Sequence, residues 1–520
     1  MVILTMEDGS VQSPFVGQRV EVAGSRGTIL YVGPVPPTKG TWLGVDWDDP
    51  SRGKHDGIHG GHRYFQARYS TSGSLVRKEK VNLGQTVIDA VKERYGGDEQ
   101  IMDEREKEEI QRAFKASLFE MVGFERLSCE NYESLTVVGL REHRVSSASE
   151  PGDLSKMCPL VEYLDLSRNL LNSWETVAHI TTGLTRLSIL DLSENRLRHE
   201  GYDLEKFKDA FRRVKFINLT RMEYNWEEIV TCAVMWPNIN KLEASFNNIT
   251  SLSTLPSHLL QNLVSLNIEG NNIKSWSEVE KLGKLPLLEY LNICNVGLTK
   301  ITIDENSRVF PSLRYLLLSE NYINNWESIS ELNKLPSLSE LRFRLNPVLE
   351  GIDRGTARQI VIARLERLKI LNTQEIPLDE RRGAEYDYLK NNTRTWMETK
   401  SEPQSRAAFL QLHPRYLELS KRYGEIEEGE IAVVSTSLKS FLKEVILVNG
   451  PLTLTKKLSP DMTVSRVKSL ARRLFNITSS DVSFVLVSQK NALVEVPLDN
   501  DMKPLSYYSI ESGDSIKIIS

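Results

Sequence analysis

The sequence predicts a multidomain protein whose three structured parts differ in fold class: a small all-β domain, an α/β repeat solenoid and an α+β domain. The first part is rich in glycine and short β-type runs, the middle part repeats an apolar pattern, and the last part returns to strands around one helix. Two charged, helical segments separate them. The predicted ranges are 1–84, 130–376 and 441–520 for the three domains, and 85–129 and 377–440 for the linkers.

Composition limits the classes of function. Of the 520 residues, 40% are hydrophobic and 26% are charged, which is typical of a globular protein. The net charge of -5 argues against a generally basic nucleic-acid binder. The four cysteines form no Cys-x-x-Cys pair and are too few for a disulfide scaffold, so we expect a reducing, cytoplasmic environment. No signal-peptide pattern or long uncharged apolar run is present, so neither secretion nor membrane association is expected.

The strongest internal signal is a repeat of the pattern apolar-x-x-apolar-x-apolar-x-x-Asn-x-apolar. One clear copy contains Leu187, Leu190, Leu192, Asn195 and Leu197. Successive copies are 24 to 27 residues apart, which matches leucine-rich repeats. The Asn positions, including two degenerate copies and two end copies that lack Asn, are His143, Asn169, Asn195, Met222, Asn247, Asn271, Val296, Asn321, Asn346 and Thr373.

Each repeat is expected to form one short strand with its apolar side chains inward, and stacked repeats then form a solenoid. The Asn side chain can satisfy backbone groups where the chain turns inside the coil. Three tryptophans that follow an Asn by five residues, Trp174, Trp276 and Trp326, are expected to pack on the convex side.

Function in the solenoid is expected at the variable strand positions of the concave face. This face mixes both charge signs with Tyr and Arg, as interfaces do, although a plain solvated surface is the alternative. The main candidates for contact with a partner are Tyr163, Glu243, Tyr290, Arg314, Arg342 and Arg344. The further candidates are Glu162, Asp165, Ser265, Asn267, Glu289, Asn292, Tyr315 and Glu340.

The most informative motif lies near the N-terminus, where Gly53-Lys54-His55-Asp56-Gly57 follows an aromatic run that contains Trp42. The glycines predict tight turns between short strands. Aromatic side chains beside such turns can form a groove, in which a lysine and loop amides could capture a chain-terminal carboxylate.

This motif resembles the CAP-Gly domain over about residues 10–82. The resemblance implies a small β-barrel that binds acidic C-terminal tails, above all that of α-tubulin. His55 stands where the family's Gly-Lys-Asn-Asp-Gly signature has Asn, and it hydrogen-bonds with a different reach and with pH dependence. By resemblance, the peptide-binding residues are Trp42, Gly53, Lys54, His55, Asp56 and Gly57.

A metal site is the alternative interpretation of this region, because His55, Asp56, His59 and His62 are close in sequence. Their spacing matches no zinc signature and no cysteine joins them, so neither a metal nor another cofactor is expected. Residues 1–84 hold ten Lys/Arg against eight Asp/Glu, a net charge of +2, so an acidic tail would meet only mild attraction.

The C-terminal part begins with Asn449-Gly450 between two apolar runs, a strong hairpin signal. A helix with Thr463 as its N-cap is predicted next, and two further strands follow. The ββαββ order resembles a ubiquitin-like β-grasp domain. The chain stops at Ser520 without a Gly-Gly tail, so we expect a recognition domain rather than conjugation, with a passive folded appendage as the alternative.

The order of the three modules closely resembles the tubulin-folding cofactor E family over nearly the whole chain. The resemblance implies a cytoplasmic, cytoskeleton-associated chaperone that binds α-tubulin. It would act with other tubulin-folding cofactors in assembly and dissociation of the αβ heterodimer. No P-loop, nucleophile elbow or zinc hydrolase motif is present, so enzymatic activity is not expected. The alternatives are a CAP-Gly microtubule scaffold and an adaptor that links tubulin to ubiquitin-pathway or proteasome proteins.

Overall fold

The computed structural model describes residues 13–96, 132–304, 307–399, 402–426, 442–477, 483–487, 495–508 and 510–519. The chain forms two compact units, Met1–Ile426 and Glu427–Ser520. The charged helix that the sequence predicts from Asp98 to Lys115 lies outside the described residues. Within the described part, no helix is both long enough and apolar enough to cross a membrane.

The N-terminal domain is an antiparallel sheet in the order β1-β2-β3-β6, accompanied by a short hairpin of β4 and β5. Its core consists of Val20, Ile29, Leu43, Val45 and Trp47. Alternation along β3 therefore leaves its other side chains on the opposite face of the sheet. The strands are β1 (Arg19–Val22), β2 (Ser25–Pro34), β3 (Thr41–Trp47), β4 (Ile58–His59), β5 (His62–Arg63) and β6 (Gly73–Arg77).

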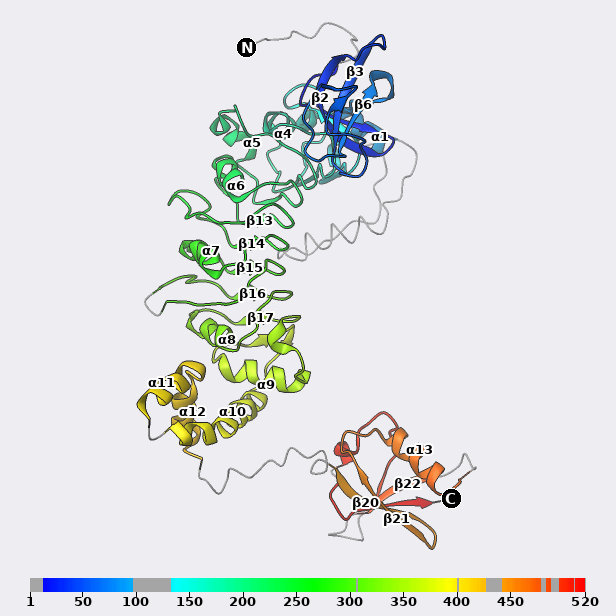
Figure 1. Ribbon diagram of the computed structural model, residues 1–520, viewed down its shortest axis with the longest axis vertical. Helices are drawn as coiled ribbons and strands as arrows, with labels where there is room; N and C mark the ends of the chain where they lie inside the picture. Colours follow the sequence, from blue (N-terminus) through cyan, green and yellow to red (C-terminus); the bar gives the residue numbers. More distant parts are fainter. Residues whose placement is uncertain are drawn as a thin grey trace. The chain divides into compact units, whose positions relative to one another are not determined.

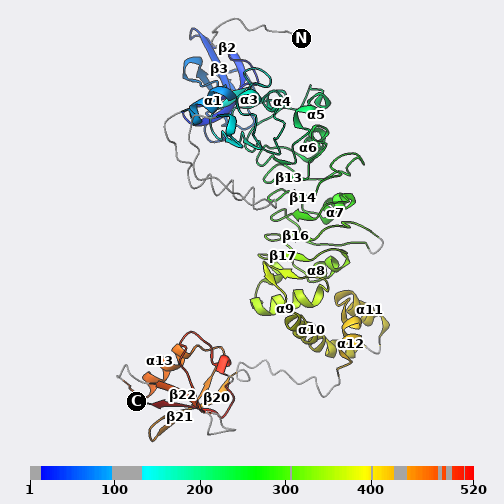
Figure 2. The same ribbon diagram turned by 180° about the vertical axis from the view of Figure 1, so that it is seen from behind.

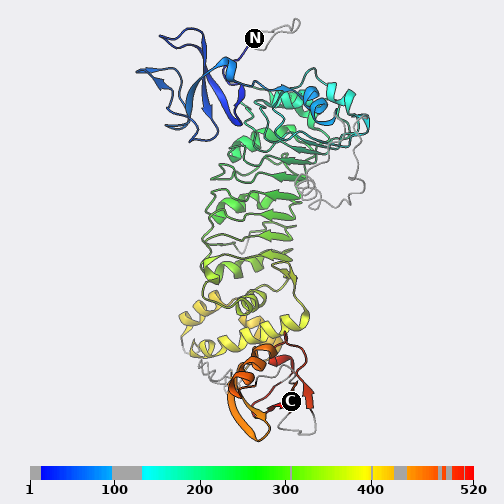
Figure 3. The ribbon, with the colours of Figure 1, turned by 90° about the vertical axis from the view of Figure 1, so that its right-hand side faces the viewer.

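The repeats form one eleven-stranded sheet, parallel except for its last pair. The strands of consecutive repeats stack one above another in Figure 3. Each copy contributes a strand of two or three residues whose central apolar side chain is buried, as Leu242 and Leu266 are. The strands are β8 (Val137–Gly139), β10 (Tyr163–Asp165), β11 (Ile189–Asp191), β12 (Phe216–Asn218), β13 (Lys241–Glu243), β14 (Ser265–Asn267), β15 (Tyr290–Asn292), β16 (Tyr315–Leu317), β17 (Glu340–Arg342), β18 (Ile370–Leu371) and β19 (Gln374–Glu375).

Short helices return the chain between strands, and they lie along the side of the repeats away from the sheet (Figures 1 and 2). Trp174 and Trp276 begin two of them and are buried, as predicted. Trp326 differs, because it is only half-buried. The helices are α3 (Asp153–Met157), α4 (Trp174–Thr181), α5 (Lys208–Phe211), α6 (Trp226–Cys232), α7 (Trp276–Glu280) and α8 (Glu327–Glu331).

A column of buried asparagines satisfies the backbone where each repeat turns. The Oδ1 atom of Asn271 accepts hydrogen bonds from the backbone N–H groups of Asn247 and Ile249, each at 3.1 Å. Its Nδ2 donates to the carbonyl oxygens of Ala244 at 3.1 Å and Ile268 at 2.8 Å. One side chain thus joins two neighbouring repeats and pairs four backbone groups at this turn.

The column tolerates the degenerate copies because each asparagine also serves the repeat before it. Met222 and Val296 are buried and apolar, and their backbone N–H groups donate to Asn247 Oδ1 at 2.9 Å and Asn321 Oδ1 at 3.1 Å. At the last copy the sequence alignment is wrong, because Leu371 pairs with the strand centre Leu341 and Thr373 therefore lies before the position of the column. The neighbouring Asn372 accepts a hydrogen bond from the N–H of Phe343 at 2.8 Å, at the end of the strand instead.

The N-terminal domain is joined to the first repeats within the same unit. Strand β7 (Gln85–Thr86) pairs with β9 (Val145–Ser147), and helix α1 (Val87–Tyr95) buries Val87, Ala90 and Val91 in the solenoid core. Helix α1 ends at Gly96, where the sequence predicts a break. Two direct contacts add to this connection: Arg68 Nη1 lies 2.6 Å from Glu223 Oε2, and Asn172 Nδ2 donates to the Gly17 carbonyl at 3.2 Å.

In its described residues, 377–399 and 402–426, the segment predicted as a charged helical linker is helical, and together with α9 of the last repeat it packs against the end of the solenoid. Ala384 belongs to the solenoid core. Glu385 is 1% exposed and is held by Arg415 at 3.0 Å, Arg422 at 3.1 Å and the Tyr423 hydroxyl at 2.7 Å. These helices therefore cap the apolar end of the repeat array. They are α9 (Arg354–Arg364), α10 (Leu378–Glu398), α11 (Pro403–Leu412) and α12 (Tyr416–Tyr423).

The second unit is an α+β domain with the sheet order β21-β20-β24-β22-β23 and one helix. The predicted hairpin at Asn449-Gly450 is present. Thr463 is the N-cap residue, although its side chain makes no capping hydrogen bond. The predicted helix face packs on the sheet through Val464, Val467 and Ala471. The elements are β20 (Lys443–Asn449), β21 (Leu452–Leu458), α13 (Val464–Leu474), β22 (Ser483–Val487), β23 (Glu495–Pro497) and β24 (Ser515–Ile519).

The asparagine column gives a test of stability. We expect Asn271→Ala to lower the free energy of unfolding by roughly 3–5 kcal/mol, because several buried backbone groups lose their partners at once. The neighbouring Asn272→Ala is the matched control, since that side chain is exposed, and it should change stability by less than about 0.5 kcal/mol. Urea unfolding of both variants measures the difference. Equal stabilities would contradict a structural role for the column.

Candidate functional site

The loop Gly53–Gly57 is fixed against the start of strand β6. The N–H of Lys54 donates to the Gly73 carbonyl, and the N–H of Gly73 donates to the His55 carbonyl, each at 2.8 Å. A Cβ on Gly53 would lie 2.3 Å from the Thr71 carbonyl oxygen, and a Cβ on Gly57 would lie 2.0 Å from that of Phe65. Gly57 also has a φ of +107°. Both positions therefore require glycine.

Three side chains of this loop have different roles. The Nδ1 atom of His55 accepts a hydrogen bond from the N–H of Gly57 at 3.0 Å, and burial together with His59 lowers its pKa. Asp56 receives a hydrogen bond from Arg63 at 2.9 Å, which lowers the pKa of its carboxyl. Lys54 is exposed and has no acidic partner within 4.0 Å in the described part of the chain. The loop thus presents one unpaired ammonium group.

Aromatic side chains extend from this loop across the sheet face opposite the core. The rings of Tyr31 and Tyr64 lie 5.3 Å apart. Trp42 donates from Nε1 to the Thr38 hydroxyl at 2.7 Å, and Arg77 lies 4.0 Å from the centre of its ring. Trp42 is thus held in place by both a hydrogen bond and a cation–π contact.

The structure brings five of the six predicted peptide-binding residues together on the loop and places Trp42 at the far end of strand β6. Trp42 pairs with Arg77, whereas the loop pairs with Gly73. These points are four residue steps apart along β6, or about 13 Å at the usual rise per residue. An extended peptide of about four residues could contact both ends.

The alternative metal site gains no support from the geometry. His59 and His62 are exposed in the β4–β5 hairpin, and the rings of His55 and His59 lie 6.2 Å apart. In the residues that the structure describes, no group of three or more His, Cys, Asp or Glu could hold a metal ion.

The solenoid sheet aligns its variable residues into two ladders, one on each side of the central apolar position. Tyr163 and Tyr290 lie in the first, and Glu243 and Arg342 lie in the second. The other two main candidates lie outside the strands: Arg314 precedes β16, and Arg344 follows β17 and donates to the Asn372 carbonyl at 3.1 Å. Arg314 and Arg342 are exposed, whereas Tyr163 is buried.

Along the first repeats, these ladders line a hollow of about 360 Å³. Lys241 lies 4.1 Å from the ring centre of Phe216 and 3.4 Å from Glu243. The lining residues are Arg141, Tyr163, Asp165, Ser167, Ile189, Asp191, Ser193, Glu194, Phe216, Asn218, Thr220, Lys241 and Glu243. The candidates predicted from sequence include Tyr163, Asp165 and Glu243 among these but miss Asp191, Phe216 and Lys241. Their strand positions in the repeat would have identified them.

Two aspartates in this hollow are adjacent in the second ladder. Asp165 accepts a hydrogen bond from the N–H of Ser167 at 2.7 Å, and Asp191 accepts from the side chain of Asn218 at 2.7 Å. Burial and the neighbouring Asp191 raise the pKa of Asp165 to about 7, and burial raises that of Asp191. This part of the concave face therefore changes charge near neutral pH.

Comparison with known families supports the modular description. A family model described as CAP-Gly domain matches residues 16–81, and one described as leucine-rich repeat matches residues 261–399. Two solved structures are also similar to parts of the chain. One is the C-terminal ubiquitin-like domain of mouse tubulin-specific chaperone e, with 31% identity, coverage of 16% of this chain and 91% of that chain, and a TM-score of 0.15. The other is the Bik1 CAP-Gly domain with an ETF peptide from Bim1, with 36% identity, coverage of 12% and 78%, and a TM-score of 0.12.

The chain is thus a CAP-Gly protein with a leucine-rich-repeat solenoid and a ubiquitin-like domain, and the predicted fold class is confirmed. Curated relatives named tubulin-specific chaperone E match it over nearly its whole length. The one from Danio rerio is 39% identical over 97% of this chain and 98% of its own length, and that from Homo sapiens is 35% identical over 97% and 98%. The chain belongs to the tubulin-specific chaperone E family.

The aspartate pair gives a pH-dependent prediction. The folded-state pKa of Asp165 is raised above its unfolded value, so the folded protein keeps a proton that the unfolded chain loses. Stability should therefore fall as pH rises from about 4 to about 7. In Asp165→Asn this loss should be smaller, by up to about 1 kcal/mol per pH unit. Calorimetry between pH 5 and pH 8 measures this dependence of stability on pH. Asp209→Asn, at an exposed position of helix α5, is the control. Parallel pH profiles for Asp165→Asn and the wild type would contradict this.

Proposed function

We propose that this chain is a tubulin-folding cofactor that binds α-tubulin at two places. The glycine loop and its aromatic neighbours hold the acidic C-terminal tail, and the concave face of the solenoid holds the folded body. The unpaired ammonium of Lys54 on a rigid glycine loop is the observation that carries this proposal. We take tubulin as the client because the chain belongs to the tubulin-specific chaperone E family.

The tail site is supported by the chemistry of the loop. Lys54 has no acidic partner in the described residues, so a carboxylate would meet an ammonium group that nothing else neutralises. His55 and Asp56 are engaged in holding the loop, through the Gly57 N–H and Arg63 respectively. Their contribution is to keep the loop in shape, whereas Lys54 and Trp42 contact the peptide.

The body site is supported by the change of character along the concave face. Near the first repeats, the hollow contains Asp165, Asp191 and Glu243. Toward the last repeats, Arg314 and Arg342 are exposed, and the rings of Tyr290 and Tyr315 lie 6.4 Å apart. Such a surface of separated charges and aromatic rings suits a large folded client in one orientation.

Two contacts on one client reinforce each other. Once the tail is bound, the body contact becomes intramolecular, and its effective concentration depends on the connection between the two sites. Both sites belong to the same compact unit, and the β7–β9 pairing and helix α1 connect them. Two weak surfaces can therefore give tight binding.

The same affinity for isolated α-tubulin accounts for both assembly and dissociation of the αβ heterodimer. A protein that binds free α-tubulin shifts the heterodimer equilibrium by mass action, and other tubulin-folding cofactors decide the direction by binding the remaining components. No covalent chemistry is required of this chain for this role, so it acts as a non-enzymatic chaperone. Its client places it in the cytoplasm, on the cytoskeleton.

The second unit is a recognition domain for another cofactor or for a ubiquitin-pathway or proteasome protein. Strand β21 lies at one edge of its sheet and exposes Leu452 and Leu454, at 59% and 37%. The same strand carries Lys456 and Lys457, which disfavour indiscriminate edge pairing, so the two leucines are suited to a specific partner chain.

The tail contact can be tested with one substitution. We expect Lys54→Ala to weaken binding of a fluorescent α-tubulin tail peptide roughly tenfold, because the carboxylate loses its charged partner. Lys80→Ala removes the same charge from an exposed position in the same domain and should leave the affinity within about twofold. Fluorescence anisotropy at fixed salt measures both. If the two variants weaken binding equally, the attraction is general rather than specific to the loop.

The chaperone role can be tested by adding the protein to purified αβ-tubulin. Gel filtration with mass analysis should show loss of the heterodimer peak and α-tubulin comigrating with this chain. Addition of the other cofactors tests whether they are needed for the release of β-tubulin. A heterodimer that stays intact with all cofactors present, and only comigrates, would instead favour a tail-binding scaffold.

A further inference from the structure

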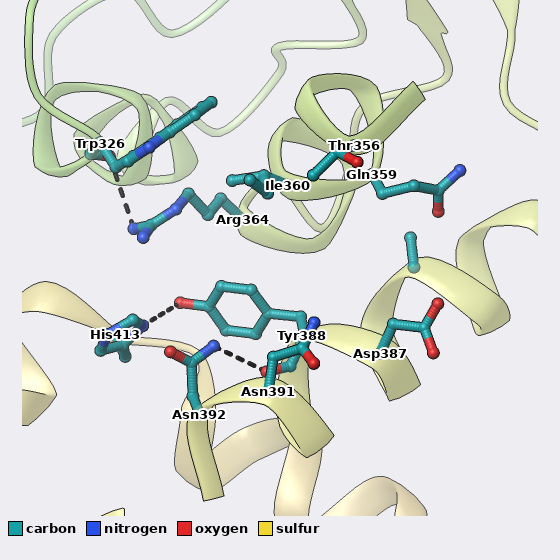
Figure 4. Close-up of a pocket in the computed structure, with 11 residues that line it drawn as sticks. Trp326, Thr356, Gln359, Ile360, Arg364, Asp387, Tyr388, Asn391, Asn392 and His413 are labelled. Atoms are coloured by element: carbon teal, nitrogen blue, oxygen red, sulfur yellow. Dashed lines mark hydrogen bonds between the residues drawn. The ribbon is translucent and has the colours of Figure 1, made fainter. Parts of the chain in front are cut away.

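A pocket of about 340 Å³ lies where the last repeat meets its capping helices, far along the chain from the proposed tail site. Figure 4 shows side chains of α9 and α10 approaching it from opposite sides, with Trp326 and His413 beside them. The lining residues are Trp326, Thr356, Gln359, Ile360, Arg364, Ala384, Asp387, Tyr388, Asn391, Asn392 and His413.

The guanidinium of Arg364 is the main feature of this pocket. Arg364 is 6% exposed, and its Nη1 donates to the Ser330 hydroxyl at 2.6 Å and the Leu412 carbonyl at 2.9 Å. Its Nε has no hydrogen-bond partner. In the described part of the chain, no carboxylate lies within 4.0 Å of it. A buried positive charge therefore faces the pocket without a direct ion-pair partner, and the carboxylate of Glu327 acts on it only from farther away.

An arginine in this state is unusual because buried charges are normally paired. Glu385 shows the normal case in the same cap, where Arg415 and Arg422 both contact it. Burial lowers the pKa of Arg364, and the opposing effects of Tyr388 and Glu327 are smaller. An anion entering the pocket would supply the missing ion-pair partner of Arg364 and accept a hydrogen bond from its unpaired Nε–H.

The neighbouring polar groups suit an anion with one charge. The Tyr388 hydroxyl and His413 Nδ1 lie 2.7 Å apart, and burial and Arg364 lower the pKa of His413 to about 4, so this histidine is neutral at pH 7. Among the described lining residues, Arg364 is the one with a permanent positive charge, and Asp387 adds a negative charge. This balance favours a monoanionic carboxylate over a dianionic phosphate.

The rest of the lining combines apolar side chains with the polar Thr356, Gln359, Asn391 and Asn392. Trp326, Ile360 and Ala384 contribute to the pocket wall beside the charged groups. Trp326 lies 5.8 Å and Tyr388 5.5 Å from Arg364, measured from its Cζ atom to each ring centre, so the cation is flanked by two aromatic faces. A pocket that combines an apolar wall with a few polar groups is typical of a ligand site.

We propose that this pocket binds a carboxylate carried on an apolar group, with Arg364 as its ionic partner. Two sources share this chemistry: a free small acid, and the C-terminal carboxylate of a partner protein that ends in an apolar residue. The site is separate from the loop of Lys54 and provides the cap helices with a function beyond closing the solenoid.

The test uses the full chain with histidine labelled for NMR and hexanoate as the probe. Hexanoate should shift the His413 signal saturably, whereas hexanamide, which has the same apolar chain and no charge, should not. Arg364→Gln should weaken hexanoate binding roughly tenfold or more, since the remaining donors are neutral. Arg354→Gln, an exposed arginine on the same helix, is the matched control and should bind as the wild type does.

A second variant covers the case in which Arg364→Gln fails to fold. Ile360→Trp fills the pocket from α9 while Arg364 stays in place, and it too should lose the hexanoate response. Peptides ending in leucine, with a free or an amidated C-terminus, distinguish the two sources. A response to the free peptide as well as to hexanoate favours a protein partner, and a response to hexanoate alone favours a small acid. Equal binding of hexanoate and hexanamide, or undiminished binding in both pocket variants, would overturn the proposal.

Discussion

The structure of the repeat unit depends on one constraint: inside a coil of parallel strands, every turn buries backbone groups that water cannot reach. The asparagine column meets this constraint, since an asparagine such as Asn271 accepts from the repeat before it and donates both to that repeat and to its own. It therefore fixes both the length of the repeats and their alignment. That alignment places equivalent side chains in ladders across the concave face, and it sets Asp165 beside Asp191.

Features that depend on residues close in sequence could be predicted. The repeat period, the Asn449-Gly450 hairpin and the glycine loop all follow from local patterns, and the structure contains each of them. Where the local pattern weakens, the prediction fails: Leu371 pairs with the strand centre Leu341, so Thr373 does not lie at the position of the column. The sequence also could not show that Asp56 accepts a hydrogen bond from Arg63, whereas Lys54 has no acidic partner within 4.0 Å among the described residues. Both depend on how the loop folds back on itself.

Features that depend on packing between distant segments could not be predicted. The raised pKa of Asp165 comes from burial by neighbouring repeats, which no single repeat encodes. The pocket around Arg364 combines α8, α9, α10 and the end of α11, whose sequences read as charged helices without a motif. Trp326 illustrates the limit: its spacing matches that of Trp174 and it packs against the solenoid core, but it also flanks a buried cation, which the spacing does not show.

The connection between the N-terminal domain and the solenoid decides how much the two proposed tubulin contacts would gain from each other. Half-exposed ion pairs such as Arg68–Glu223 contribute little and weaken with salt. The buried side chains of α1, Val87, Ala90 and Val91, belong instead to the solenoid core and are insensitive to salt. A connection anchored this way restricts the positions of the tail site and raises the effective concentration of the second contact. On this argument, the strength of bivalent capture depends more on the apolar anchoring of α1 than on the charges between the two domains.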